Sequence, residues 1–497
     1  MTQVLVAGID TSTQSVKVRV TDANTGRMVR FGQAKHPHGT SVNPQFWWDA
    51  FLEAAQQAGG LDDVSALAVG GQQHGMVLLD ARGRVVRDAL LWNDTRSAPD
   101  AERLIEELGE SEKTADESDL ADDPMMRGRQ RWVKAVGSSL VASLTITKIA
   151  WVAEHEPEHA DRVAAVCLPH DWLSWRIAGH GPVEEGKTAD FDDLFTDRSD
   201  ASGTGYFDAV SNSYRMDLFK MAFKRDNVRL PRLVQSHDVA AMADPSIAGK
   251  DVEGGCIIAP GGGDNAMASL GLNMKIGDVS ISLGTSGVAA AIAPDPVYDM
   301  SASVTGFADC TDHWLPLACT INGSRIIDAG RSMLNVDYQE LSDLALKSRP
   351  GAEGITLIPY FDGERTPNRP EAKGTLHGMT MNNVKPENIA RAFVESLLCT
   401  QRDCLELIED LGVNVKRILL IGGGSKTPAV RELLPSILGS AVALPHPDEY
   451  VAIGAARQAA WVLDGSDQAP EWPVAIDETL SGEPNNDVFQ QYASYRG

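Results

Sequence analysis

The stretch VLVAGIDTSTQSVKVRVTD, residues 4–22, carries the pattern that decides the fold. Residues 4–10 are apolar up to a final acid, as in a buried strand, and residues 16–22 alternate between apolar and polar side chains, which predicts a second strand. The polar segment TSTQS joins them, and RMVRFGQ follows at 27–33 after a turn. This order predicts an antiparallel meander whose first turn is rich in hydroxyl groups.

The same order returns in IGDVSISLGTSGVAAAIAP, residues 276–294, where a Gly/Thr/Ser turn separates two apolar strands. Each copy begins its own half of the chain, as in a duplicated domain. Near the end, helical patterns at 386–411 and 449–463 alternate with short apolar strands, which predicts parallel pairing. We therefore expect an α/β protein of two domains, residues 1–249 and 250–497, with a cleft between them.

The composition of the 497 residues, 43% of them hydrophobic, is typical of a globular protein. The formal charge of -25 predicts that the chain binds neither nucleic acid nor an anionic membrane, because its field repels polyanions. The N-terminus has no basic region and no run reaches about 18 apolar residues, so we expect a cytoplasmic protein. Six scattered cysteines without metal-site spacing read as free thiols, and the acidic stretch 106–129 reads as a solvated surface excursion.

The segment PGGGDNA, residues 260–266, places Asp264 and Asn265 where an apolar strand stops and a helix rich in small residues begins. Such junctions commonly carry the chemistry of α/β sheets. The spacing also resembles a dinucleotide-binding fingerprint. An acid inside the turn would repel a pyrophosphate, so an NAD-dependent oxidoreductase is the third-ranked alternative.

Three further turns are candidate nucleotide contacts. IDTSTQSVK (9–17) offers hydroxyl and amide groups to phosphates, a lysine, and an acid that suits Mg²⁺ through water: Thr11, Ser12, Thr13, Lys17 and Asp10. SLGTSG (282–287) repeats this chemistry at the head of the second half. IGGGSKT (421–427) is not a P-loop because Ser425 separates the glycines from the lysine, but it could lie near a nucleotide. For each turn, the plainer alternative is a glycine that ends a strand.

Two other segments are candidates for binding a polyol. GGQQHG (70–75) offers Gln73 and His74, and LWNDTR (91–96) adds Trp92 as an apolar wall beside polar groups. The polar run DRSDASGTGYFD (197–208) reads either as a loop over the same site or as an ordinary surface loop.

Taken together and in order, these motifs resemble the FGGY family of carbohydrate kinases over nearly the whole chain. The motifs that carry the resemblance are GIDTSTQSVK (8–17), GGQQHG (70–75), LWNDTR (91–96), SDASGTGYFD (199–208), PGGGDNA (260–266), SLGTSG (282–287), PYFDGERTP (359–367) and IGGGS (421–425). The resemblance implies two actin-like (ribonuclease-H-like) domains, of which the N-terminal one binds sugar and the C-terminal one binds ATP.

The resemblance also implies roles for individual residues. Asp264 matches the catalytic base, and Asp10 matches the acid that works with Mg²⁺ and the phosphates. The implied sugar contacts are Gln73, His74, Asp264 and Asn265, and the implied ATP contacts are the Thr11–Thr13 turn, Gly284, Thr285, Gly323 and Gly424. Two positions depart from the family pattern, since Ser12 stands where glycine is usual and Gln73 where methionine is frequent.

The expected reaction is transfer of the γ-phosphoryl group of ATP to a sugar hydroxyl, and the sugar-binding motifs favour D-xylulose. Gluconate, ribulose and glycerol are the alternative acceptors within the family. An actin-fold ATPase without a sugar substrate is the alternative from another class. The resemblance also suggests a homodimer.

Overall fold

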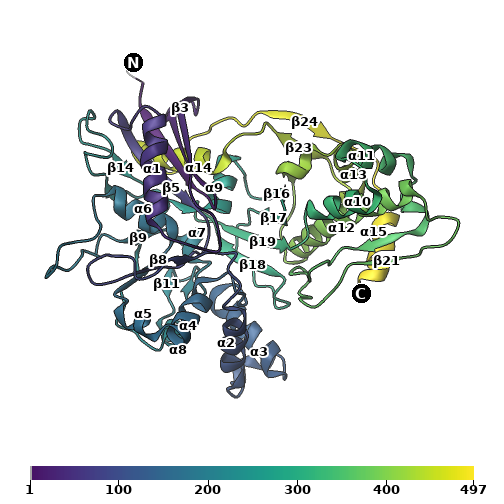
Figure 1. The fold of residues 1–497 in the computed structure, drawn as a ribbon, viewed down its shortest axis with the longest axis horizontal. Coiled ribbons are helices and arrows are strands. Elements are labelled where there is room, and N and C mark those ends of the chain that lie inside the picture. The colour runs from purple at the N-terminus through teal and green to yellow at the C-terminus, as the bar shows by residue number, and fades with distance from the viewer. Residues whose placement is uncertain (1–2) are drawn as a thin grey trace. The chain divides into compact units, whose positions relative to one another are not determined.

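The structure, a computed structural model, describes residues 3–497, which divide into two compact units (Figure 1). The first unit holds the residues up to Met274, Gly306–Trp314 and Asp448–Pro473, and the second holds Lys275–Thr305, Leu315–Pro447 and Val474–Gly497. We expected a division after residue 249. The observed one follows Met274, so the PGGGDNA turn lies in the first unit.

The sheet of the first unit contains the expected meander. β1 (Leu5–Thr11), β2 (Ser15–Asp22) and β3 (Met28–Lys35) pair antiparallel, while β5 (Val64–Gly71) pairs parallel with β1. The strand order is β3-β2-β1-β5-β14-β13, where β14 spans Ile257–Ile258 and β13 spans Ala241–Met242. A further short strand, β15 (Gly262–Gly263), also pairs with β5.

The sheet of the second unit repeats this arrangement. Its order is β18 (Val304–Ala308), β19 (Trp314–Thr320), β17 (Gly287–Ala291), β16 (Asp278–Leu283), β22 (Arg417–Ile421), β23 (Val442–Pro445) and β24 (Ile476–Leu480). β16 pairs antiparallel with β17 and parallel with β22, as β1 does with β2 and β5. The predicted duplication of an α/β unit is therefore confirmed.

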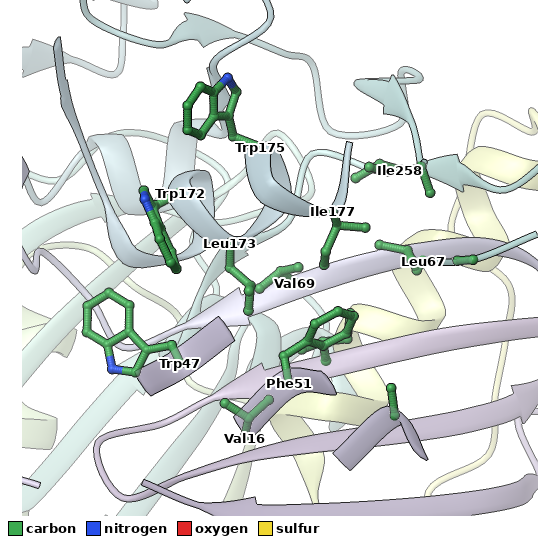
Figure 2. Packing of buried hydrophobic residues seen from close by; sticks show 14 of the residues in the cluster. Val16, Trp47, Phe51, Leu67, Val69, Trp172, Leu173, Trp175, Ile177 and Ile258 are labelled. Atoms are coloured by element: carbon green, nitrogen blue, oxygen red, sulfur yellow. The ribbon is translucent and has the colours of Figure 1, made fainter. Parts of the chain in front are cut away.

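One face of the first sheet carries a large aromatic core (Figure 2). Trp47 and Phe51 of α1 (Gln45–Gln57) and Trp172 of α6 (Pro169–Ile177) are buried with strand residues such as Val16 and Val69. Aromatic side chains bury much apolar surface, so this layer anchors the strands whose ends carry the candidate site.

The other face of the first sheet is covered by α14 (Tyr450–Asp464), which packs on β1, β5 and α9 (Asp264–Gly271). In Figure 1 this yellow-green helix lies beside strands coloured purple, from the opposite end of the chain. Alternate residues of a strand lie on the same face, so positions 8 and 10 of β1 both face α14. A Cβ on Gly8 would lie 1.8 Å from the carbonyl oxygen of Ala452, which is why the contact needs glycine.

The remaining elements connect or cover these sheets. In the first unit they are β4 (Ser41–Val42), β6 (Val77–Leu79), β7 (Ala89–Leu90), α2 (Ala98–Glu110), η1 (Ala115–Glu117), α3 (Pro124–Val136), α4 (Thr145–His155), α5 (Pro157–Arg162), β8 (Ala165–Cys167), β9 (Phe195–Thr196), α7 (Arg198–Ala201), β10 (Phe207–Asp208), β11 (Ser213–Tyr214), α8 (Met216–Phe223) and β12 (Arg232–Leu233). In the second they are α10 (Arg325–Leu334), α11 (Tyr338–Lys347), η2 (Ala352–Gly354), β20 (Thr356–Ile358), β21 (Thr375–His377), α12 (Pro386–Asp410), η3 (Gly423–Lys426), α13 (Pro428–Leu438) and α15 (Asn486–Arg496).

All six cysteines are free. Within residues 3–497, no helix has both the length and the apolar content needed to cross a bilayer.

Candidate active site

The parallel pairing of the first sheet brings three of the predicted motifs to one edge. Asp10 of β1 is in register with Gly70 of β5, and Gly262 of β15 is in register with the same glycine. The loops that follow these strands therefore start side by side at their carboxyl ends, where α/β proteins place ligands.

The PGGGDNA turn has no room for larger residues. Gly261 has a φ of 80°, and a Cβ there would lie 2.5 Å from the carbonyl oxygen of Val69. The peptide of Gly261 is held by the side chain of Gln458 on α14, with its N–H donating at 2.8 Å and its carbonyl accepting at 3.1 Å. The N–H of Gly263 donates to the Ser199 hydroxyl at 3.2 Å. The three glycines thus form a turn that is fixed by hydrogen bonds and places Asp264 directly after it.

Asp264 is the first residue of α9 and is half-buried. The side-chain amide of Asn265 donates to Gln73 Oε1 at 2.6 Å and to Asp264 Oδ1 at 3.1 Å. The acid and the two amides therefore form one hydrogen-bonded group.

The pKa of Asp264 is raised from 3.8 to about 7. The main cause is burial, which disfavours the charged carboxylate, and the negative charges of Asp10 and Asp200 add to it. The backbone N–H of Asn265, which donates to Oδ1 at 2.7 Å, works in the opposite direction. A carboxyl group with such a pKa can exchange a proton near neutral pH.

His74 lies next to this group and is held by the run 197–208. Its backbone N–H donates to Asp200 Oδ1 at 3.1 Å, and its ring stacks at an angle on Phe307 with centroids 5.1 Å apart. The run had been read either as a loop over the site or as a surface loop, and the contact with His74 supports the first reading. Asp200 itself was missed, because an acid in a polar run carries no local sign of its partner.

The first loop holds a charged trio. Lys17 of β2 lies 3.0 Å from Asp10 Oδ2 and 2.6 Å from Glu449 Oε2. Burial raises the pKa of Asp10, and the nearby ammonium group offsets part of that rise. Burial favours a neutral lysine, yet the two carboxylates raise the pKa of Lys17 overall. Lys17 was predicted to meet a phosphate, and in this structure its charge is shared by two acids. Glu449 was not predicted.

The hydroxyl groups of this loop differ in their environment. Thr11 is buried, and its Oγ1 has no hydrogen-bond partner among residues 3–497. The Ser12 hydroxyl donates to the Ser15 carbonyl at 2.9 Å and so closes its own turn. The indole of Trp92, 45% exposed, donates to the Thr13 hydroxyl at 3.3 Å. Trp92 therefore lies against the first loop, as well as belonging to a predicted sugar-binding motif.

In the second unit, the predicted nucleotide residues gather at the carboxyl ends of β16, β19 and β22. The N–H of Gly323 donates to the Thr285 carbonyl at 3.0 Å, and the N–H of Ser324 donates to the Gly284 carbonyl at 2.8 Å. A Cβ on Gly424 would lie 2.7 Å from the Cβ of Leu283, so this glycine packs on the end of β16. The loops that follow these three strands therefore pack closely against one another through their backbone.

No group of three or more His, Cys, Asp or Glu side chains in the described chain is placed to hold a metal ion. The predicted site residues form two clusters, and each cluster lies within one unit. One joins Asp10, Gln73, His74, Asp264 and Asn265 in the first unit, and the other joins Gly284, Thr285, Gly323 and Gly424 in the second.

A duplicated ribonuclease-H-like α/β unit, with acids and amides on one copy and glycine loops on the other, is typical of a class of two-domain kinases. Comparison with known proteins agrees. Residues 5–271 match the N-terminal domain of the FGGY family of carbohydrate kinases, and residues 279–463 match its C-terminal domain. The chain belongs to the FGGY family of carbohydrate kinases and is an ATP-dependent carbohydrate kinase.

Individual relatives are similar over most of their length. Xylulose kinase from Streptomyces coelicolor is 41% identical over 488 residues, which cover 96% of this chain and 92% of the relative. The solved structure of xylulose kinase from Bifidobacterium adolescentis is 64% identical, has a TM-score of 0.96 and is covered completely, as is this chain. Gluconate kinase from Lactobacillus acidophilus has a TM-score of 0.83 at 20% identity, covering 99% of this chain and 96% of its own, which shows the fold alone.

Proposed function

We propose that this chain transfers the γ-phosphoryl group of ATP to D-xylulose and forms D-xylulose 5-phosphate. Two relatives named xylulose kinase support this acceptor. One is 41% identical to this chain, and the other, whose structure is solved, is 64% identical. The observation that carries the chemistry is the half-buried carboxyl group of Asp264, with its pKa of about 7, hydrogen-bonded into a cluster of amides.

Asp264 acts as the general base. Phosphoryl transfer depends mainly on positioning and charge neutralisation, so one well-placed acceptor for the proton suffices. The 5-hydroxyl oxygen forms a bond to the γ-phosphorus, the bond from that phosphorus to the β–γ bridging oxygen breaks, and the hydroxyl proton passes to the Asp264 carboxylate. ADP leaves with the bridging oxygen.

The neighbouring polar groups orient the sugar. The Asn265 amide nitrogen already donates to Gln73 and Asp264, so its Oδ1 is the atom left to accept from a sugar hydroxyl. His74, Gln73 and the exposed face of Trp92 supply further contacts. Such fixed donors and acceptors reduce the entropy lost when the hydroxyl group is aligned for attack.

Asp10 suits a magnesium ion that comes with the nucleotide. Its Oδ1 is buried and has no hydrogen-bond partner among the described residues, and Mg²⁺ in kinases commonly takes only one or two carboxylates, with phosphates and water as its other ligands. When bound, the ion neutralises charge on the β- and γ-phosphates.

The remaining nucleotide contacts follow the two clusters. Thr11, Ser12, Thr13 and Lys17 of the first unit would contact phosphates. Gly284, Thr285, Gly323 and Gly424 of the second unit would contact the rest of the nucleotide. We infer further that the enzyme is cytoplasmic and, from its family resemblance, that it forms a homodimer. Its charge of -25 supports the inference that it does not bind nucleic acid.

The test is ADP formation by the purified protein with a panel of D-xylulose, D-ribulose, D-gluconate and glycerol. We expect D-xylulose to have the highest kcat/KM and the 5-hydroxyl to be phosphorylated. If gluconate or glycerol had the highest kcat/KM, the assignment of D-xylulose as the acceptor would be wrong, while the proposed role of Asp264 would stand. ATP turnover stimulated by peptides but by no sugar would favour an actin-fold ATPase instead.

A further inference from the structure

The turn that carries Gly323 is held by a residue of another motif. This turn, residues 321–324, joins β19 to α10 and contacts the SLGTSG loop through the N–H groups of Gly323 and Ser324. The two residues before them, Ile321 and Asn322, donate their N–H groups to the side chain of Glu364 instead. Glu364 belongs to the motif PYFDGERTP (359–367), to which the proposed function assigns no role.

The Glu364 carboxylate accepts four hydrogen bonds. Its Oε1 accepts from the N–H of Ile321 and, at 2.8 Å, from the N–H of Arg365. Its Oε2 accepts from the side-chain amide of Asn322 at 3.0 Å and from the N–H of the same residue at 3.4 Å. An ionised carboxylate only accepts hydrogen bonds, so it suits a place where each of these partners is a donor.

Glu364 is itself firmly placed. Its side chain is buried, its N–H donates to the Arg369 carbonyl at 2.9 Å, and its own carbonyl accepts from the Arg369 N–H at 2.8 Å. The preceding residue, Gly363, has a φ of 82°, and a Cβ there would lie 2.2 Å from the carbonyl oxygen of Pro370. A carboxylate anchored through its own backbone in this way can determine the position of the groups that donate to it.

The two residues before Glu364 add contacts to the same turn. The carbonyl of Gly363 accepts from the Asn322 side-chain amide at 2.9 Å, and Asp362 pairs with Arg325, the first residue of α10. The ion pair is exposed to water and contributes little, whereas Asn322 is fully buried. The buried hydrogen bonds between Asn322 and the 363–364 segment therefore hold the turn more strongly than the surface pair.

We propose that Glu364 is a positioning residue for nucleotide binding. It fixes Ile321 and Asn322, and through them it holds Gly323 against the loop of Gly284 and Thr285, so that the turn is formed before ATP arrives. A preformed turn loses less conformational freedom when a ligand binds. This inference rests on the proposed role of Gly323 as a nucleotide contact, and it assigns the support of that contact to the PYFDGERTP motif.

The test compares variants of the full chain. Glu364→Ala leaves the four donors without their acceptor, and Glu364→Gln keeps the shape but replaces one acceptor oxygen with an NH₂ group. Glu395→Gln is the matched control. Glu395 is also buried in the second unit and accepts from a backbone N–H, that of Gly351 at 3.1 Å, and from Arg391, neither of which belongs to a proposed nucleotide loop.

The first readout is the Kd for a non-hydrolysable ATP analogue with Mg²⁺, measured by titration calorimetry. It should rise at least about tenfold in Glu364→Ala, the scale of one hydrogen bond to a charged group, and at least about threefold in Glu364→Gln. KM for ATP should rise with it, while KM for D-xylulose stays within about twofold. Glu395→Gln should lower the Tm and leave the Kd unchanged.

The second readout is amide hydrogen exchange of the protein without ligands. Exchange at residues 321–324 should be faster in Glu364→Ala than in the unmodified protein, because the turn has lost the acceptor for its first two N–H groups. Near-UV circular dichroism confirms folding, and if Glu364→Ala does not fold, Glu364→Gln carries both measurements.

An unchanged Kd in both Glu364 variants would overturn the inference, and so would an equal rise in Glu395→Gln, because a general loss of stability would then explain the effect. Gly323→Ala separates this inference from the proposed function. A Cβ there would lie 2.4 Å from the carbonyl carbon of Ser286, so this variant should also weaken binding of the analogue.

Two combinations of results distinguish the two failures. If Gly323→Ala weakens nucleotide binding and the Glu364 variants do not, the proposed nucleotide contact stands and the positioning role of Glu364 is wrong. If the Glu364 and Gly323 variants weaken nucleotide binding but the unmodified protein phosphorylates no D-xylulose, the proposed acceptor is wrong and the positioning role stands.

Discussion

Asp264 is the residue on which the proposed proton transfer depends, and its surroundings set the pH range in which it acts. Burial, with added repulsion from Asp10 and Asp200, raises its pKa to about 7. A general base must be deprotonated, so kcat/KM for D-xylulose should rise about tenfold per pH unit below that value and level off above it. Initial rates of ADP release at saturating ATP measure this profile, and a flat profile between about pH 5.5 and 8.5 would contradict it.

The same environment predicts a conflict between activity and stability at this residue. Because the folded-state pKa lies above the ordinary value of 3.8, the fold is favoured while Asp264 is protonated and loses stability as pH rises from about 4 to about 7. Asp264→Asn removes that ionisation. We expect the variant to lose at least roughly 10²-fold in kcat.

We also expect the variant's Tm at pH 8 to exceed that of the unmodified protein by roughly 1–3 °C. The difference should be much smaller near pH 4, where Asp264 is protonated in the folded chain and partly protonated in the unfolded chain. Calorimetry at the two pH values measures it. A lower Tm for Asp264→Asn at pH 8 would show that the ionised carboxylate stabilises the fold.

At the scale of elements, α14 determines where α9 presents Asp264. A Cβ on Gly454 of α14 would lie 1.9 Å from the carbonyl oxygen of Met267 on α9, so the two helices meet backbone to backbone. Gly454→Ala must push α9 away from α14. We expect a loss of stability of about 1–3 kcal/mol, as for other overpacked contacts, together with at least a tenfold fall in kcat.

Gly128 of α3 provides the control for this prediction. A Cβ there would also lie 1.9 Å from a carbonyl oxygen, that of Ile105 on α2, but neither helix carries a proposed site residue. Gly128→Ala should lower the Tm to a similar extent and leave kcat at 25 °C within about twofold. Equal loss of kcat in both variants would show that general destabilisation, rather than displacement of α9, explains the effect.

At the scale of the whole molecule, the two clusters predict a division of labour. D-xylulose alone should slow amide hydrogen exchange at residues 70–75 and 260–266 of the first unit. A non-hydrolysable ATP analogue with Mg²⁺ should slow it at 282–287 and 421–427 of the second unit, because a bound ligand stabilises the loops that contact it. Hydrogen-exchange mass spectrometry of the full chain measures both. Protection of 421–427 by D-xylulose without protection of 260–266 would contradict the assignment.

Much of the fold and part of the site could be predicted from local patterns. Alternation and apolar runs identified β1, β2 and β3, and the repeat at 276–294 identified two strands of the second sheet, because strand formation depends on side-chain period over a few residues. The glycine run at 261–263 drew attention to Asp264 and Asn265, since glycine is typical of turns that need a positive φ or a close backbone approach. Once the strands pair parallel, the register of Asp10 with Gly70 brings two predicted motifs together.

Other features were decided only by the tertiary structure. Lys17 meets Glu449 across 432 residues, and His74 meets Asp200 across 126. The helix α14 lies in sequence between β23 and β24 of the second unit and yet packs on the first sheet. A local pattern determines which face of a helix or strand is apolar. Many helices and strands of this chain have such a face, so the pattern does not determine which of them pack together. The partner of a buried charge depends on which of those faces pack together, and that choice is made by the free energy of the whole fold.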